Sequence, residues 1–191
     1  MKIYLYLRAF TFLVLLGLYS CRAVPGDNEA PVAEATPDAA EKTIVYVVRH
    51  AEKDVSDPAE QDADLTAAGV ARAEALKETL RGEPVAALFA TKYTRTISTL
   101  KPLSSDRKLV IQQYEAHDFN GLRQQILEQY AGKTVVVVGH SNTVLPIVEG
   151  FGVKRPVSDI SDSQYDYIFK VTIAPGASTT VETANYGAGT L

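Results

Sequence analysis

The chain has 191 residues, of which 46% are hydrophobic and 22% are charged. This is the composition of a globular protein, and it excludes a disordered or fibrous chain. Acidic residues (23) outnumber basic ones (19), and the net charge of −4 argues against nucleic-acid binding, because no basic stripe is present to displace phosphate counterions.

The first segment of the chain has the features of a secretion signal. Lys2 and Arg8 form a short basic region, and residues 9–19 are apolar and uncharged. This apolar run is too short to cross a bilayer comfortably, but it fits the apolar region of a signal peptide. We therefore predict that residues 1–20 are a signal peptide.

The only cysteine of the chain, Cys21, follows this segment directly. The sequence Leu18-Tyr19-Ser20-Cys21 resembles the lipobox of bacterial lipoproteins, in which the cysteine becomes the lipidated N-terminus. Several acyl chains acting together hold a protein to a membrane stably. The resemblance implies lipidation at Cys21 and a lipid-anchored location in the bacterial cell envelope, on the periplasmic or extracellular side. The alternatives are an ordinary secretory signal with an incidental cysteine, or an uncleaved anchor.

Residues 22–42 have the composition of a flexible linker. Pro25, Pro31 and Pro37 are scattered among alanines and acidic residues, and the apolar residues show no period. We predict that the lipidated cysteine and this linker, residues 21–42, hold a folded domain, residues 43–191, away from a membrane surface.

Within that domain, the apolar patterns predict strands and helices in alternation. Apolar runs predict strands at 44–48, 86–90, 108–112 and 135–138, of which the first and the last are rich in β-branched residues and should be buried on both faces. Helical spacing bounded by Gly or Pro predicts helices at 65–81, 93–103, 119–130 and 143–149, of which the second should close near Pro102. Alternation around Pro175-Gly176 predicts a closing hairpin, 167–173 with 179–185. This order predicts a three-layer α/β/α sandwich with a mostly parallel central sheet.

Arginines and histidines follow three of the predicted strands. Arg49 and His50 come directly after the first strand, Arg95 lies shortly after the second, and His140 follows the last. Parallel strands end at the same edge of a sheet, which is where open α/β sheets bind ligands. The four side chains are therefore expected to meet in one crevice.

Two guanidinium groups and two imidazoles in one crevice suit phosphoryl chemistry. Guanidinium forks match the oxygens of a phosphate ester, and helix N-termini add backbone donors. A neutral imidazole can attack phosphorus, and histidine titrates near neutral pH. Since the leaving oxygen needs a proton, we also expect a carboxylic acid beside the crevice.

Four separated motifs resemble those of the histidine phosphatases, the superfamily that contains the cofactor-dependent phosphoglycerate mutases. They are Arg49-His50-Ala51-Glu52, Leu65–Gly69 with Arg72-Ala73, the segment 91–99 around Arg95, and Gly139–Thr143. The likeness spans nearly all of the predicted domain in the same order and spacing, although Ala51 replaces the commoner Gly. It implies a phosphoglycerate mutase-like fold.

The resemblance also implies a role for each residue of the crevice. His50 would be the nucleophile that carries the phosphoryl group. Three residues would bind the phosphate and stabilise the transition state: Arg49, Arg95 and His140. As general acid we favour Glu115 over Asp118, given that the acid must reach the leaving oxygen. The expected activity is hydrolysis of phosphomonoesters, or of a related phosphoryl compound, without a metal or other cofactor.

Other functions stay open at this point. A mutase of the same family would need long insertions over the site, for which the spacing of the motifs leaves little room. A non-catalytic lipoprotein could bind phosphorylated ligands in the same crevice. A metal hydrolase is disfavoured, because the three histidines of the chain are dispersed.

The expected substrate is a phosphorylated small molecule or a phosphoprotein. Its identity should depend on the irregular segments that border the crevice, namely 54–64, 114–120 and 152–164.

Overall fold

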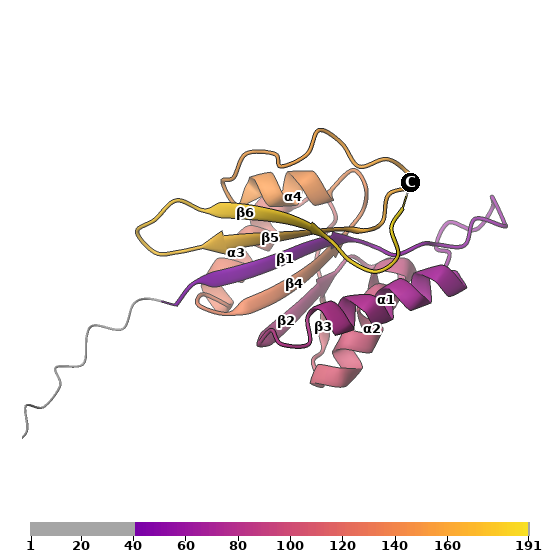
Figure 1. Ribbon diagram of the computed structural model, residues 1–191, viewed down its shortest axis with the longest axis horizontal. Coiled ribbons are helices and arrows are strands. Elements are labelled where there is room, and N and C mark those ends of the chain that lie inside the picture. Colours follow the sequence, from indigo (N-terminus) through magenta and orange to yellow (C-terminus); the bar gives the residue numbers. More distant parts are fainter. Residues whose placement is uncertain (1–40, 191) are drawn as a thin grey trace, which may run out of the picture. The chain divides into compact units, whose positions relative to one another are not determined.

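A computed structural model of the protein describes residues 41–190. Their helices and strands follow in the order β1 (Thr43–Arg49), α1 (Ala67–Thr79), β2 (Val85–Ala90), α2 (Thr94–Arg107), β3 (Ile111–Gln113), α3 (Phe119–Gln129), β4 (Thr134–Gly139), α4 (Val144–Gly150), β5 (Tyr167–Ile173) and β6 (Thr180–Asn185) (Figure 1). The predicted signal peptide, Cys21 and most of the linker lie outside the described residues. Over the described range, no helix is long and apolar enough to cross a membrane.

The strands form one six-stranded sheet in the order β3-β2-β4-β1-β5-β6. Strands β3, β2, β4 and β1 are parallel to one another, whereas β5 is antiparallel to both β1 and β6. The register sets Arg49 opposite Gly139, and the backbone N–H of His50 donates to the Gly139 carbonyl at 2.9 Å. His50 and His140 therefore leave the sheet side by side. The prediction of a mostly parallel sheet is confirmed.

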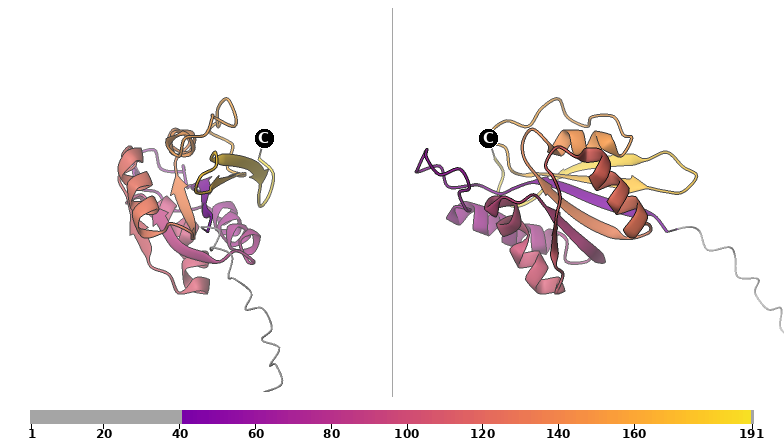
Figure 2. Two further views of the ribbon diagram at one scale, coloured as in Figure 1. Left: turned by 90° about the vertical axis from the view of Figure 1, so that its left-hand side faces the viewer. Right: turned by 180° about the vertical axis from the view of Figure 1, so that it is seen from behind.

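Helices cover both faces of the sheet, which gives the predicted three layers (Figure 2). Side chains alternate between the two faces of a strand, so Val45 and Val47 of β1 join the core under α3 and α4, while Tyr46 and Val48 join the core under α1 and α2. The four valines of β4 are all fully buried. This two-sided packing fixes the positions at which β1 and β4 end.

Two predicted boundaries are wrong. Helix α2 continues through Pro102 to Arg107 instead of closing near the proline. Proline removes one backbone hydrogen bond from a helix, but Leu100 and Leu103 on either side of it are fully buried, and this packing stabilises the helix. The helix ends where Lys108 takes the left-handed conformation, with φ 55°. Strand β3 consequently begins later than predicted.

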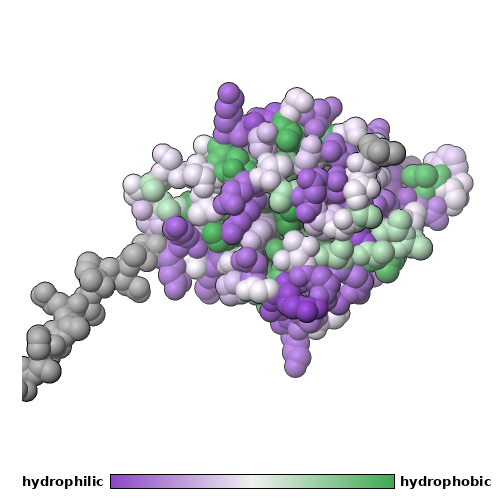
Figure 3. All heavy atoms as spheres, viewed as in Figure 1, coloured by the Kyte–Doolittle hydropathy of each residue, from purple (hydrophilic) through white to green (hydrophobic). Residues whose placement is uncertain are grey.

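The surface mixes hydrophilic and hydrophobic residues on the face shown in Figure 3. Among the described residues, the large hydrophobic side chains that are exposed come from separate parts of the fold: Val55, Val70 and Val110. A polar cavity lies at the ends of the parallel strands.

Candidate active site

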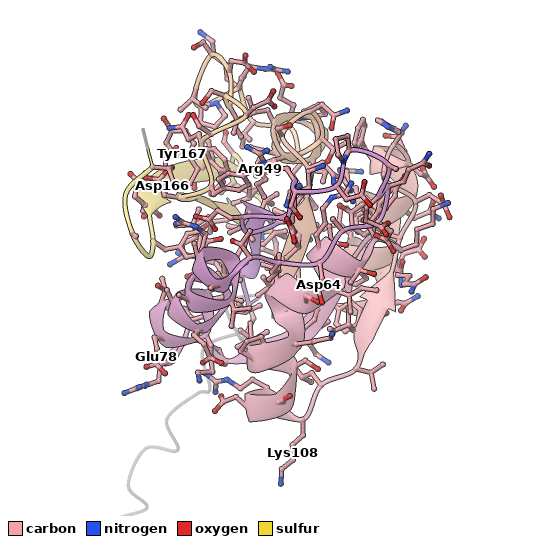
Figure 4. The ribbon with its side chains drawn as sticks, turned by 90° about the vertical axis from the view of Figure 1, so that its right-hand side faces the viewer. Arg49, Asp64, Glu78, Lys108, Asp166 and Tyr167 are labelled. Carbon is pink, nitrogen blue, oxygen red and sulfur yellow. The ribbon has the colours of Figure 1, made fainter. Side chains whose placement is uncertain are left out.

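A cavity of about 540 Å³ opens where the parallel strands end, and its lining comes from the segments that follow β1, β2, β3 and β4. It brings together all the site residues expected in the described domain: Arg49, His50, Arg95, Glu115, Asp118 and His140. Figure 4 looks toward this edge of the sheet, with Arg49 near the middle. Nowhere between residues 41 and 190 do three His, Cys, Asp or Glu side chains group as a metal site would require.

His50 lines the cavity and is only 4% exposed. Its Nδ1 is 2.8 Å from the carbonyl oxygen of Ala51. Because a carbonyl can only accept, this contact assigns the proton to Nδ1 and leaves the lone pair on Nε2. Burial lowers the pKa of His50 to about 3, and the nearby arginines act in the same direction. The ring is thus neutral at neutral pH, which is the form that can act as a nucleophile.

His140 faces His50, with the ring centroids 5.5 Å apart and the planes at 65°. Its Nε2 lies 3.0 Å from the Thr91 hydroxyl oxygen, and its Nδ1 lies 3.5 Å from Nη2 of Arg95. Burial, followed by the positive charge of Arg95, lowers the pKa of His140 to about 4. An anion bound between the two rings would favour their protonated forms, since opposite charge stabilises an imidazolium.

Arg49 is held by the segment that precedes β5. Its Nη1 donates to the carbonyl oxygens of Ser161, Asp162 and Gln164 at 2.8, 3.0 and 2.9 Å. Its guanidinium lies 4.0 Å from the centroid of the Tyr165 ring. Burial lowers the pKa of Arg49, but a guanidinium remains charged in a protein. The backbone and the ring fix its orientation without neutralising its charge.

Arg95 enters the cavity from the first turn of α2, and its guanidinium lies 4.3 Å from the centroid of the Tyr93 ring. Its Nε and Nη1 are buried without a hydrogen-bond partner. The nearest carboxylate, that of Asp62, is 3.9 Å from Nη1, which is an ion-pair distance but too long for a hydrogen bond. Buried donors without an acceptor are costly, so this guanidinium is suited to an anionic ligand.

Three threonines position these side chains, and the sequence alone does not reveal their role. The hydroxyl oxygen of Thr99 accepts from the backbone N–H of Ala51 at 2.9 Å, which fixes the chain just after His50. The hydroxyl oxygens of Thr91 and Thr96 are 3.0 Å apart and support His140. The clustering of threonines around Arg95 in segment 91–99 is the signal that could have identified them.

A buried ion pair ties the segment after His50 to the end of the described chain. Nε and Nη2 of Arg72 both donate to the carboxylate of Glu52, at 2.8 to 3.0 Å. The same guanidinium donates to the carbonyl oxygens of Tyr186 and Ala188, each at 2.8 Å. Gly69 lets α1 approach closely, because a Cβ at this position would lie 2.2 Å from the Glu52 carbonyl oxygen. This network gives the motif Leu65–Gly69 with Arg72-Ala73 a structural role.

The two candidates for the general acid differ in their contacts. The carboxylate of Asp118 accepts from the backbone N–H of Gly121 at 2.9 Å and so caps α3. The carboxylate of Glu115 is exposed at the cavity and forms no hydrogen bond or ion pair with the described part of the chain. His117, which the sequence did not single out as catalytic, also lines the cavity.

Comparison with protein families agrees with this geometry. Residues 45–118 match the model of the histidine phosphatase superfamily (branch 1), a range that includes Arg49, His50 and Arg95. No curated protein matches the chain.

Several solved structures share the fold at low sequence identity. The protein histidine phosphatase SixA, complexed with tungstate, has a TM-score of 0.60 and 17% identity, and the match covers 74% of this chain and 96% of that one. YhfR of Bacillus stearothermophilus has a TM-score of 0.60 and 17% identity, covering 75% and 96% of the two chains. A mycobacterial glucosyl-3-phosphoglycerate phosphatase has a TM-score of 0.60 and 10% identity, covering 77% and 100%. At these identities the likeness shows the fold.

Proposed function

We propose that the protein belongs to the histidine phosphatase superfamily, branch 1, whose model residues 45–118 match, and that it is a metal-independent phosphatase that hydrolyses phosphomonoesters, or a related phosphoryl compound, through a phosphohistidine. The observation that carries the proposal is the state of His50, a buried neutral ring with its Nε2 lone pair free. Beside it lie two guanidiniums, those of Arg49 and Arg95, and neither donates a hydrogen bond to a carboxylate of the described residues.

The proposed reaction has two displacements at phosphorus. In the first, Nε2 of His50 forms a bond to phosphorus while the bond to the leaving oxygen breaks, and Glu115 donates a proton to that oxygen. In the second, water attacks the phosphohistidine, the carboxylate of Glu115 accepts its proton, and inorganic phosphate leaves. Three cationic or protonatable groups stabilise the charge on the transferring oxygens: Arg49, Arg95 and His140.

The contacts of the two acids favour Glu115 for this role. One carboxylate oxygen of Asp118 accepts from the backbone N–H of Gly121, so this side chain is engaged as the N-terminal cap of α3. The carboxylate of Glu115 forms no hydrogen bond with the described residues, and Glu115 lines the cavity.

The sequence motif at Cys21 leads us to propose further that the chain is a lipoprotein. The lipid would tether the domain through residues 22–42 to a membrane of the bacterial envelope, and a phosphorylated small molecule or phosphoprotein on that side would be its substrate.

A generic aryl phosphate tests the proposed reaction. With chelator present, the wild-type domain should release phosphate, and His50→Ala should reduce turnover by at least about a thousandfold, since nucleophile loss removes the covalent route. Circular dichroism and thermal unfolding check that the variant is folded. Turnover by a folded His50→Ala equal to that of the wild type would contradict the proposal. Phosphoglycerate interconversion faster than hydrolysis would favour a mutase instead.

A further inference from the structure

Both arginines of the cavity rest on a tyrosine ring. The guanidinium of Arg49 lies 4.0 Å from the centroid of Tyr165, and that of Arg95 lies 4.3 Å from the centroid of Tyr93. The two tyrosines come from different parts of the fold, one from the segment before β5 and the other from the residue that precedes α2. The same support therefore arises twice in one cavity.

A third buried arginine of the domain shows a different arrangement. Arg72 is 3% exposed, and all three of its nitrogens donate to oxygen atoms, two of them to the carboxylate of Glu52. Its charge is paired with a carboxylate and each of its nitrogens donates to an oxygen, which suits a structural role. An aromatic face orients a guanidinium without occupying its N–H groups or cancelling its charge.

Each tyrosine also contacts one of the two histidines. The Tyr93 ring meets His140 edge to face, with the centroids 5.3 Å apart and the planes at 90°. The Tyr165 ring is tilted toward His50, with the centroids 6.1 Å apart. One tyrosine thus borders each pair of an arginine and a histidine. Neither tyrosine hydroxyl forms a hydrogen bond within the described residues, so the contacts of these side chains with the arginines and histidines are made by their rings.

We propose that Tyr93 and Tyr165 are positioning residues of the phosphate site, each of which holds one guanidinium and borders one imidazole with its aromatic face. The inference rests on the proposed function for its relevance to catalysis, but the anion binding that it predicts can be measured without turnover.

The surroundings of the two arginines predict that loss of the Tyr93 ring and loss of the Tyr165 ring weaken phosphate binding to different extents. Asp62 lies 3.9 Å from Nη1 of Arg95, so without the Tyr93 ring this guanidinium can turn toward the carboxylate and form a full ion pair. Arg49 is also held by three carbonyl oxygens, which remain when Tyr165 is replaced. Loss of the Tyr93 ring should therefore weaken phosphate binding more than loss of the Tyr165 ring.

The experiment measures binding of inorganic phosphate by calorimetry. Tyr93→Leu should raise the Kd on the order of tenfold and Tyr165→Leu about threefold, the range expected when a partly buried cation–π contact is lost. Tyr93→Phe and Tyr165→Phe should bind like the wild type, because they keep the ring. The matched control is Tyr130→Leu, which removes a ring that packs on Phe89 outside the cavity lining. It should leave the Kd unchanged.

A shape-preserving variant covers the case in which a leucine variant does not fold. Pentafluorophenylalanine at position 93 keeps the ring but removes its negative face, and it should weaken phosphate binding as leucine does. With an aryl phosphate, the same changes should raise KM more than they lower kcat.

Several results would overturn the inference: leucine variants that bind phosphate like the wild type, phenylalanine variants as weak as the leucine ones, or a wild-type domain that binds no phosphate. Phosphate binding with the predicted pattern but no hydrolysis of any phosphate ester would instead contradict the proposed function and support the positioning role.

Discussion

Burial gives the two cavity histidines their chemical character. An exposed imidazole is largely neutral at pH 7 but gains a proton just below it, whereas the pKa of His50 is lowered to about 3 and that of His140 to about 4. A neutral Nε2 on His50 is therefore retained well into the acidic range. The cost of this arrangement is a dependence of stability on pH.

The domain should lose stability as the pH falls from about 6.5 toward 3. Over this interval the unfolded chain binds a proton at position 50 that the folded chain does not, so the free energy of unfolding decreases by roughly 1.4 kcal/mol per pH unit from His50. Urea titrations at pH 7 and pH 5 measure the change. His50→Asn should show a loss smaller by about 2 kcal/mol over this range. An identical loss in the variant and the wild type would show that this ring is not held neutral.

Helix α2 gains its N-terminal cap from a loop distant in the sequence. The carboxylate of Asp62 accepts from the backbone N–H of Thr94 and from its hydroxyl, both at 2.8 Å. Tyr93, which occupies the N-cap position, provides no side-chain hydrogen bond. Asp62 thus joins the loop 54–64 to the helix that carries Arg95.

Removal of this cap should destabilise the domain. Asp62→Ala should lower the free energy of unfolding by about 1 kcal/mol, because an N-terminal donor of α2 loses its partner. The control is Asp57→Ala in the same loop, whose carboxylate accepts only from the nearby backbone N–H of Ala59, and which should cost less than about 0.5 kcal/mol. Chemical denaturation of both variants measures the difference. Equal effects would mean that Asp62 is not the cap of α2.

The existence and order of the elements could be predicted from the sequence, whereas some of their ends could not. The valine run of β4 and the period of α3 are local signals that survive in the fold. The continuation of α2 past Pro102 depends on leucines that pack against the sheet, and this packing is not visible in a local pattern. The left-handed residue Lys108, which ends α2, is likewise set by tertiary structure.

At the scale of the whole domain, strand order brings the site together. The sequence predicted that Arg49, His50 and His140 meet, because local patterns show that each of them follows a strand and parallel strands end at the same edge of a sheet. The supports of these residues were not predictable in this way. Tyr165 and the carbonyl of Ser161 reach Arg49 across more than a hundred residues of chain, and only the fold shows that they do.

The proposed lipid anchor makes a prediction about the full chain. In a bacterial host that processes lipoproteins, the wild type should fractionate with membranes, and Cys21→Ser should appear in the soluble fraction, since the cysteine is the proposed site of acylation. Hydrolysis of an aryl phosphate by the released variant should match that of the wild type. Membrane association of Cys21→Ser at wild-type levels would contradict lipidation at this residue.

The most direct measurement is a rapid-quench reaction with a labelled phosphate ester, followed by peptide mapping under alkaline conditions that preserve phosphohistidine. The account predicts a transient phosphoryl group on His50 that forms and decays at rates consistent with turnover, and that is missing from His50→Asn. Turnover with no phosphorylated enzyme, or with the label on His140 instead, would contradict it.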